Sequence, residues 1–227
     1  MTTSSSTILT SAVKPSLLSL QVGQPKQLDF HGKAWTSAIY KAPVVARIRL
    51  ERVNLDGDRQ YNLKYHGGPD KAVCCFSAEH YSYWRDEFSL GETFTYGAFG
   101  ENFTLAGLLE TEACIGDIYT VGTAQIQVSQ PRQPCINVAR KWDSKEMPRR
   151  MEELGHTGYY LRVLLAGEVG AGDTLILQER PHPDFTIHRL NRAMYQDEST
   201  LEQDTRLASL PELAASGRRI FQRRLQK

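Results

Sequence analysis

The chain contains 227 residues, of which 41% are hydrophobic and 23% are charged, which is the composition of a globular protein with a substantial hydrophobic core. Its 27 basic and 26 acidic residues leave a net charge of +1, which argues against binding to nucleic acid or to a membrane surface through charge alone. No apolar run approaches the roughly 20 residues that a membrane span requires, so no membrane partner is expected.

The N-terminal residues 1–15 are rich in serine and threonine. They do not show the basic segment followed by an apolar segment that marks a secretory signal. We therefore expect a flexible N-terminal extension and, by default, a cytoplasmic location.

The first half of the remaining chain predicts strands and one helix. Residues 43–53 alternate between apolar and polar and are rich in β-branched side chains, which is typical of a strand. Asp56 and Gly57 then give a turn signal. Residues 71–76 form a short apolar run, and Ser77 is placed to cap a helix over residues 77–88. The aromatic side chains of that helix recur at helical spacing and favour core packing: Tyr81, Trp84 and Phe88.

The second half predicts further strands, expected at residues 116–121, 124–129, 159–166 and 173–178. A helix is expected over residues 144–154, where Met147, Met151 and Leu154 share a face. Many short strands with few helices indicate a mainly β fold with some α, a β-barrel domain over residues 16–180.

Beyond a proline-containing linker at residues 181–183, the pattern becomes helical. Apolar residues at helical spacing predict a small three-helix domain over residues 184–227, with Pro211 in the first turn of its third helix. A domain of this size is marginally stable alone, so we expect it to dock on the barrel or on a partner. Because its end, residues 218–227, is basic, a nucleic-acid-binding role is an alternative. We disfavour it because acidic residues are scattered through the same helices.

Cysteine spacing argues against a structural zinc site. The four cysteines are Cys74, Cys75, Cys114 and Cys135, and they contain no C-x-x-C pair. Cys74 and Cys75 lie in an apolar run and are interpreted as packing residues.

Basic residues concentrate around a pair of glycines, which is one candidate site. Gly67 and Gly68 allow the backbone to approach a ligand closely and to turn N–H groups toward an anion. The basic side chains nearby would suit a phosphate or another oxyanion, but on the residues alone we slightly favour a solvated turn. These side chains are Arg59, Lys64, His66 and Lys71.

Two further segments carry polar groups suited to chemistry. Glu101 and Asn102 could hold a cation, move a proton or hydrogen-bond a ligand, although a turn before a strand accounts for them as well. Residues 130–137 follow an apolar strand and include Gln130, Arg132 and Cys135. If Cys135 begins a helix, the helix dipole and Arg132 both favour its thiolate form, which can ligate a soft metal or attack an electrophile.

These segments together resemble a known family. The sequences KYHGGPDKAV, AFGENFT, an Ile-Gly-Asp turn and VSQPRQPC occur here in the order and at the spacing found in MOSC-domain proteins. The segment GKAWTSAIYK at residues 32–41 and the helices at residues 184–227 are similar to those of the YiiM-like group within that family.

The resemblance implies a MOSC-type β-barrel that binds the molybdenum cofactor (molybdopterin), with Cys135 as the protein ligand to the metal. It also implies reduction of N-hydroxylated small molecules such as 6-hydroxylaminopurine, with electrons from a separate flavin reductase. Within this reading Cys135 and His66 are the catalytic candidates. The contacts to the cofactor are expected from Arg59, Lys64, His66, Gly67, Gly68, Lys71, Glu101, Asn102, Gln130, Arg132 and Cys135.

Two other functions stay open at this point. Cys135 could carry a persulfide in a sulfur transferase, or the chain could bind and deliver the cofactor without turnover. The oligomeric state is also open, with a homodimer as one option.

Overall fold

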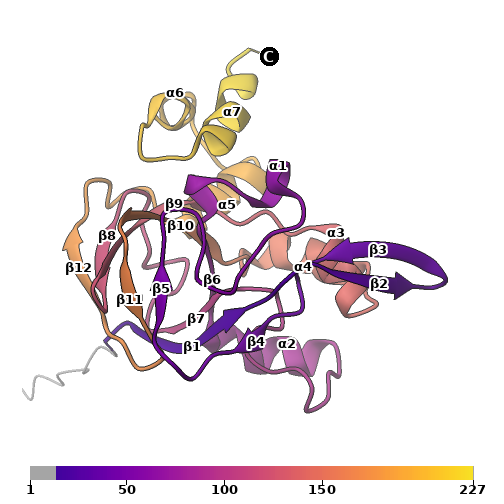
Figure 1. Cartoon of the computed structure of the whole chain (residues 1–227). Helices are drawn as coiled ribbons and strands as arrows, with labels where there is room; N and C mark the ends of the chain where they lie inside the picture. Colours follow the sequence, from indigo (N-terminus) through magenta and orange to yellow (C-terminus); the bar gives the residue numbers. More distant parts are fainter. Residues whose placement is uncertain (1–13, 227) are drawn as a thin grey trace, which may run out of the picture.

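A curled sheet of eight strands forms the centre of this computed structural model, which describes residues 14–226 (Figure 1). The strand order is β12-β8-β9-β10-β6-β7-β1-β4. Strands β6 and β7 run parallel, and the other neighbouring pairs are antiparallel. The strands are β1 (Ser16–Val22), β4 (Ala42–Pro43), β6 (Val73–Ser77), β7 (Phe103–Ala106), β8 (Ile118–Val121), β9 (Ala124–Pro131), β10 (Tyr159–Leu165) and β12 (Leu175–Glu179).

The sheet curls until its two sides meet. The backbone N–H of Leu17 in β1 donates to Asp173 O at 2.8 Å, and Gly172 N donates back to Leu17 O at 2.7 Å. These bonds join β1 to the segment that leads into β12 and turn the sheet into a half-barrel. Two small sheets lie outside it, one made of β5 (Ile48–Leu50) and β11 (Gly167–Val169), the other a hairpin of β2 (Lys26–Phe30) and β3 (Lys33–Ser37).

Besides the hydrophobic core of the barrel, a second hydrophobic cluster lies between the sheet and three helices. These are α2 (Tyr81–Glu87), α3 (Ile136–Lys141) and α4 (Glu146–Leu154). Tyr81 and Trp84 of α2 are buried against Phe76 and Phe99, so the predicted aromatic stripe packs in the core. Met147 and Met151 of α4 are fully buried in the same cluster, as their spacing predicts.

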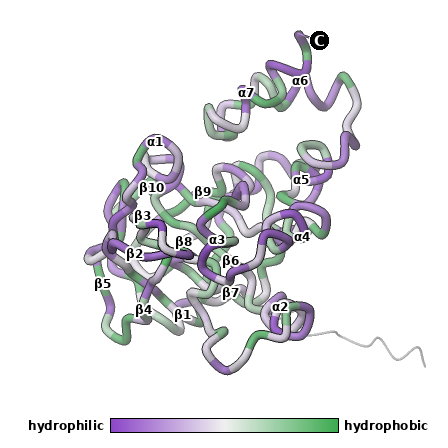
Figure 2. The backbone as a smooth tube through the Cα atoms, turned by 90° about the vertical axis from the view of Figure 1, so that its right-hand side faces the viewer, coloured by the Kyte–Doolittle hydropathy of each residue, from purple (hydrophilic) through white to green (hydrophobic). Residues whose placement is uncertain are grey.

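Three helices follow the barrel at the C-terminal end: α5 (Ile187–Tyr195), α6 (Leu201–Ser209) and α7 (Ala215–Arg224). In the side view of Figure 2, α6 and α7 lie beyond α5 and away from the sheet. Thr186 caps α5 and Thr200 forms a capping box with Gln203 at α6. Residues from these helices share one hydrophobic core with the barrel: Ile187, Leu190, Ala193, Leu207, Ala208 and Phe221. The predicted fold class, a mainly β barrel-like domain with a small three-helix unit, is confirmed.

Some local predictions are wrong. Residues 43–53 do not form one strand, because the chain bends between β4 and β5. Ser77 does not cap a helix with its side chain; its hydroxyl donates to Leu108 O at 3.2 Å instead. Pro211 lies in a turn before α7, since the carbonyls of that turn accept hydrogen bonds from the Arg218 guanidinium.

The flexible extension expected at residues 1–15 lies almost entirely outside the described residues. Within residues 14–226, no helix is both long enough and apolar enough to cross a membrane.

Substitution of Gly158, directly before β10, tests how tightly the sheet is packed. Its φ is +72°, and a Cβ there would lie 2.2 Å from Cys75 O, whereas Gly172 has φ +93° with nothing within 4 Å. We expect Gly158→Ala to lower the free energy of unfolding by roughly 2–4 kcal/mol, since it adds a backbone clash to the unfavourable φ. Gly172→Ala should cost only about 1 kcal/mol. Urea unfolding of both variants measures this; equal losses would show that no close contact limits Gly158.

Candidate functional site

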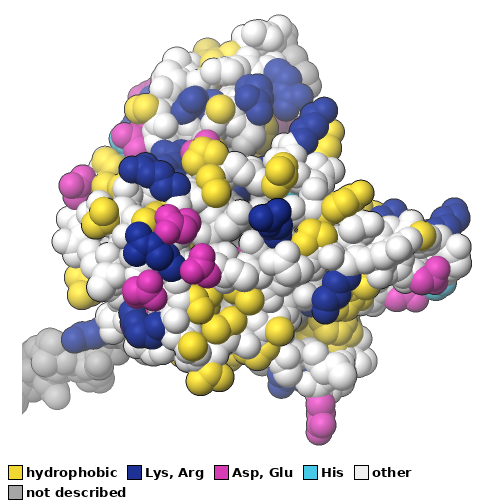
Figure 3. All heavy atoms as spheres, in the orientation of Figure 1, with side chains coloured by type: hydrophobic (Ala, Val, Ile, Leu, Met, Phe, Trp, Pro, Cys, Tyr) yellow, Lys and Arg dark blue, Asp and Glu magenta, His cyan; other side chains and the backbone are white. Residues whose placement is uncertain are grey.

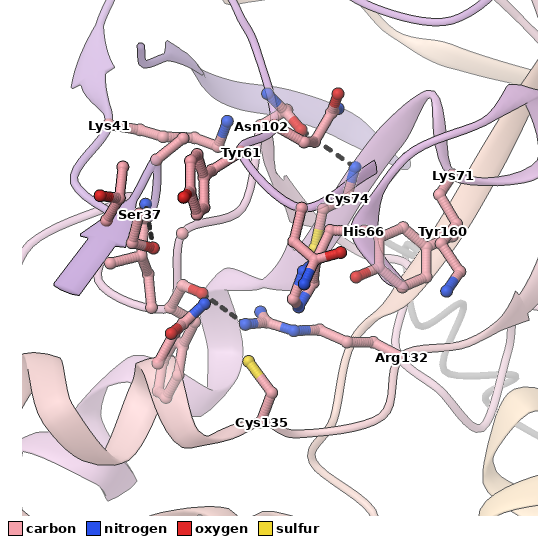
Figure 4. A pocket seen from close by; sticks show the side chains of 18 residues that line it. Ser37, Lys41, Tyr61, His66, Lys71, Cys74, Asn102, Arg132, Cys135 and Tyr160 are labelled. Atoms are coloured by element: carbon pink, nitrogen blue, oxygen red, sulfur yellow. Dashed lines mark hydrogen bonds between the residues drawn. The ribbon is translucent and has the colours of Figure 1, made fainter. Parts of the chain in front are cut away.

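A cavity of about 200 Å³ opens where the end of β9 meets the segments around β3 and β6 (Figure 4). Its walls come from residues 36–41, from the loop and short helix α1 (Leu63–His66), from β6 and from the start of α3. Five of the residues that the sequence singles out line it: His66, Lys71, Asn102, Arg132 and Cys135. Segments far apart in the chain therefore meet here.

Cys135 occupies the position before the first residue of α3, with extended backbone angles of φ −132° and ψ 167°. Burial raises the pKa of its thiol, but a hydrogen bond from His66 and the charge of Arg132 outweigh burial and lower the pKa to about 7. A large fraction of Cys135 is therefore thiolate at neutral pH, the form that ligates a metal or attacks an electrophile.

Arg132 extends between Cys135 and Cys74 in Figure 4. Its side chain is 5% exposed, and one guanidinium nitrogen, Nη2, donates to Phe99 O at 2.5 Å. The other terminal nitrogen, Nη1, is buried and has no hydrogen-bond partner in the protein. A buried donor of fixed positive charge without a partner is unusual and marks a place where an anionic ligand fits.

Lysines add to the positive character of the cavity. Lys71 donates from Nζ to Tyr65 O at 2.5 Å, and its Nζ also faces the ring of Tyr160. Burial lowers the pKa of Lys71. Lys41 forms a buried ion pair with Asp58, so its charge is largely balanced.

Six residues predicted to contact a cofactor do not line the cavity. The Glu101 carboxylate is fully buried and accepts hydrogen bonds from Gly97 N at 2.7 Å and Phe99 N at 3.1 Å, so it holds its own loop. The amide oxygen of Gln130 accepts from Ser216 at 2.5 Å. The remaining four lie on or near exposed turns: Arg59, Lys64, Gly67 and Gly68. Their contribution to ligand binding stays a prediction.

Several lining residues were not singled out from the sequence. Ser37 and Lys41 come from the segment that carries the upstream resemblance, so that likeness was the available signal. Tyr61 and Tyr160 gave no signal and Cys74 was interpreted as a packing residue, because an aromatic or apolar residue beside a strand or turn usually is one. Their positions follow only from the folded chain.

Large exposed apolar side chains lie on the segments that form the walls of the cavity. Tyr61, Leu63, Tyr65 and Ile136 are each 59–65% exposed, and α1 buries none of its residues. Figure 3 shows one face of the molecule, on which hydrophobic side chains lie between charged ones. Of these four residues Tyr61 lines the cavity itself, and Tyr65 and Ile136 are sequence neighbours of His66 and Cys135.

A buried histidine cluster supports the loop behind Arg132. The Glu110 carboxylate pairs with His80 Nε2 at 2.8 Å and accepts from Gly158 N at 2.8 Å. The carbonyl of Gly158 in turn accepts from Arg132 N at 3.0 Å. The ring of His156 stacks on His80 with 3.8 Å between centroids.

Residues 14–226 contain no group of three or more His, Cys, Asp or Glu side chains arranged to hold a metal ion. Among the cavity residues, Cys135 is therefore the one side chain with a low-pKa thiol that could serve as a soft metal ligand.

Comparison with known proteins identifies the family. The MOSC domain description matches residues 62–176, and the YiiM-like, 3-alpha helix domain description matches residues 185–227. The chain belongs to the MOSC-domain family, in its YiiM-like group. MOSC domains in general are associated with binding of the molybdenum cofactor.

Relatives cover most of the MOSC chain. It is 43% identical to the uncharacterized protein YflK of Bacillus subtilis (strain 168), over 92% of this chain and 94% of that one. It is 38% identical to protein YiiM of Escherichia coli (strain K12), over 83% and 84% of the two chains. The crystal structure of YiiM from Geobacillus stearothermophilus superimposes with a TM-score of 0.78 at 37% identity, covering 93% of this chain and 99% of that one.

Alkylation of Cys135 tests the electrostatics of the site. The rate of reaction with iodoacetamide, followed by mass spectrometry of the Cys135 peptide, should rise with a midpoint near pH 7, because the pKa of this thiol is about 7. His66→Gln should move the midpoint to higher pH. Lys64→Gln, an exposed neighbour outside the cavity, is the matched control and should not. An unchanged midpoint in His66→Gln would contradict the His66–Cys135 interaction.

The histidine cluster predicts a loss of stability in mild acid. Burial lowers the pKa of His156 to about 4 from 6.5, with a further contribution from His80 and an opposing one from Glu110. Between these pH values the unfolded chain binds a proton that the folded chain does not, so stability falls as the pH drops from about 6.5 toward 4. Burial raises the pKa of Glu110, but the interaction with His80 outweighs burial and holds this pKa below 4.5, so the carboxylate is mostly ionised at pH 5.

The measurement compares thermal midpoints at pH 7.5 and pH 5. His156→Gln should lose less on acidification than the native chain, because its side chain cannot bind the proton. His31→Gln is the control: His31 is exposed and pairs only with Asp143, so this variant should behave as the native chain does. An equal loss in all three proteins would show that His156 is not the sensor.

Proposed function

We propose that this MOSC-domain protein holds the molybdenum cofactor in the cavity around Cys135 and reduces N-hydroxylated small molecules there. The single observation that carries the proposal is the pairing of a low-pKa thiol with the buried, unpartnered Nη1 of Arg132 in one cavity. A thiolate suits the soft metal of such a cofactor, and a guanidinium suits its anionic groups.

Side chains of the cavity fit this group. Cys135 would provide the protein sulfur to the metal, and Arg132 would donate from Nη1 to an anionic oxygen. Lys71 offers a second donor at the same wall. Asn102 forms part of the cavity wall with both ends of its amide engaged: Oδ1 accepts from Cys74 N at 3.2 Å and Nδ2 donates to Gln21 O at 3.2 Å. When bound, the cofactor supplies the two-electron redox couple that the reaction needs.

The reaction is R–NH–OH plus two electrons and two protons, giving R–NH₂ and water. His66 shares the cavity with Cys135, and its imidazole can donate and accept a proton, which makes it the candidate to deliver one toward the departing oxygen. Tyr61, which lines the cavity, would help to exclude water around the substrate. The electrons would come from a separate reductase, for which a flavin protein is the expected class.

A named relative is consistent with a reductive function. The chain is 32% identical to a protein of Gibberella moniliformis (strain M3125 / FGSC 7600) named Reductase, over 78% of this chain but only 32% of that protein. The name describes that protein, most of which lies outside the matched region. It supports placing the proposed activity among oxidoreductases.

The decisive experiment is molybdenum and pterin analysis of freshly purified protein, together with reduction of 6-hydroxylaminopurine by a dithionite-reduced dye. The native chain should contain both components and turn over. Cys135→Ser should lose at least about 100-fold in turnover, because a metal ligand is removed, while its thermal midpoint stays nearly unchanged. Cys114→Ser, a buried cysteine outside the cavity, is the control and should retain activity.

Other outcomes separate the alternatives. Protein without molybdenum that releases sulfur from Cys135 with cyanide would favour sulfur transfer and overturn the proposal. Protein that retains cofactor but never turns over would favour a carrier. Full activity in Cys135→Ser would remove this cysteine from the site.

A further inference from the structure

The segment that carries Arg132 and Cys135 is held from two sides as it leaves β9. On one side β10 pairs with it, with Gln130 opposite Tyr160 and Arg132 N donating to Gly158 O at 3.0 Å. On the other side β8 reaches only as far as Gln127, followed by two bonds at Val128, whose N–H donates to Asp117 O at 2.9 Å and whose carbonyl accepts from Gly116 N at 2.9 Å. Beyond Val128 this second edge requires another partner.

The start of α7 provides that partner. Ala214 N, directly before the helix, donates to Ser129 O at 2.9 Å. Two residues later, Ser216 Oγ donates to the amide oxygen of Gln130 at 2.5 Å. Ala214 and Gln130 are both buried and Ser216 is half-buried, so the contact lies at the inner side of the helix start.

Ser129 also ties this contact to the other wall of the cavity. Its hydroxyl donates to Asp70 O at 2.6 Å, in the loop that runs from His66 to Lys71. Arg219 of α7 lies close enough to Lys71 to lower its pKa, although burial of Lys71 has the larger effect. Figure 3 shows Lys and Arg side chains gathered over this C-terminal part of the molecule.

We propose that the start of α7 is a brace that fixes residues 129–135 in place, with Ser216 as a positioning residue for Arg132 and Cys135. The C-terminal three-helix unit then completes the site rather than serving only to dock a partner. This inference needs Arg132 and Cys135 to be the working groups of the cavity, whatever reaction they perform.

The physical reason is the burial of the Gln130 amide. Without the Ser216 hydroxyl, the amide oxygen of buried Gln130 loses the donor that ties it to α7, so the segment is less restrained and can shift. Arg132 is two residues away, so a shift of Gln130 moves the guanidinium relative to the Cys135 thiolate. Small displacements of such groups have large effects on reactivity.

A double-mutant cycle on the full chain, without cofactor, tests the brace. The variants are Ser216→Ala, Gln130→Met and the double variant, and the readout is the pH profile of Cys135 alkylation by iodoacetamide. Ser216→Ala should raise the midpoint and slow the reaction at pH 7 by about three- to ten-fold. The double variant should be no slower than the slower single variant, because both changes break one contact. Ser216→Thr, which keeps the hydroxyl, should restore the native profile.

Ser209→Ala is the matched control. Its hydroxyl bonds only to Thr205 O and Arg206 O within α6, so the alkylation profile should stay native. An unchanged profile in folded Ser216→Ala, or additive effects in the double variant, would overturn the brace. Since alkylation requires neither molybdenum nor substrate, failure of the brace and failure of the proposed reductase activity would be distinguishable.

Discussion

The buried charge of Arg132 is the constraint on which the site depends. The guanidinium remains protonated at any physiological pH, and within residues 14–226 it forms no ion pair with a carboxylate. Burying such a charge costs several kcal/mol unless an anion compensates it. The Cys135 thiolate provides part of that compensation, and Nη1 remains directed at a ligand. The fold therefore leaves part of the buried Arg132 charge uncompensated, and an anionic cofactor can compensate it.

To place the Arg132 guanidinium beside a ligand, the backbone around Arg132 must be held firmly. Three parts of the chain contribute to this. The pairing of β9 with β10 sets the direction of the segment. The Glu110 carboxylate, pinned by His80, fixes Gly158, whose carbonyl holds the Arg132 N–H. The start of α7 supports the opposite edge at Ser129. The barrel, the histidine cluster and the C-terminal helices thus all contact one short loop.

Sequence patterns predicted the parts of this arrangement that depend on local periodicity. The strands β8, β9, β10 and β12, the helix α4 and the three C-terminal helices follow from apolar spacing. Patterns of this kind could not place β1 or the β2–β3 hairpin, since these strands are short of continuous apolar residues and are defined by partners distant in the chain. Motif resemblance predicted that Cys135, Arg132 and His66 belong to one site. It could not exclude Glu101 and Gln130, because these residues differ from the lining residues only in the direction of their side chains.

The same limit explains why the sequence predicted only that the C-terminal helices dock on the barrel or on a partner, without linking them to the site. In the sequence Ser216 is an ordinary polar residue near a helix start, and no periodic pattern links it to Gln130, 86 residues earlier. A hydrogen bond of that kind becomes visible only when the two chain segments are placed together. Because the bond joins the last unit of the chain to the end of β9, the reactivity of Cys135 should depend on the folding of a unit that contains no candidate catalytic residue. A site built this way couples completion of the fold to the formation of its reactive thiolate.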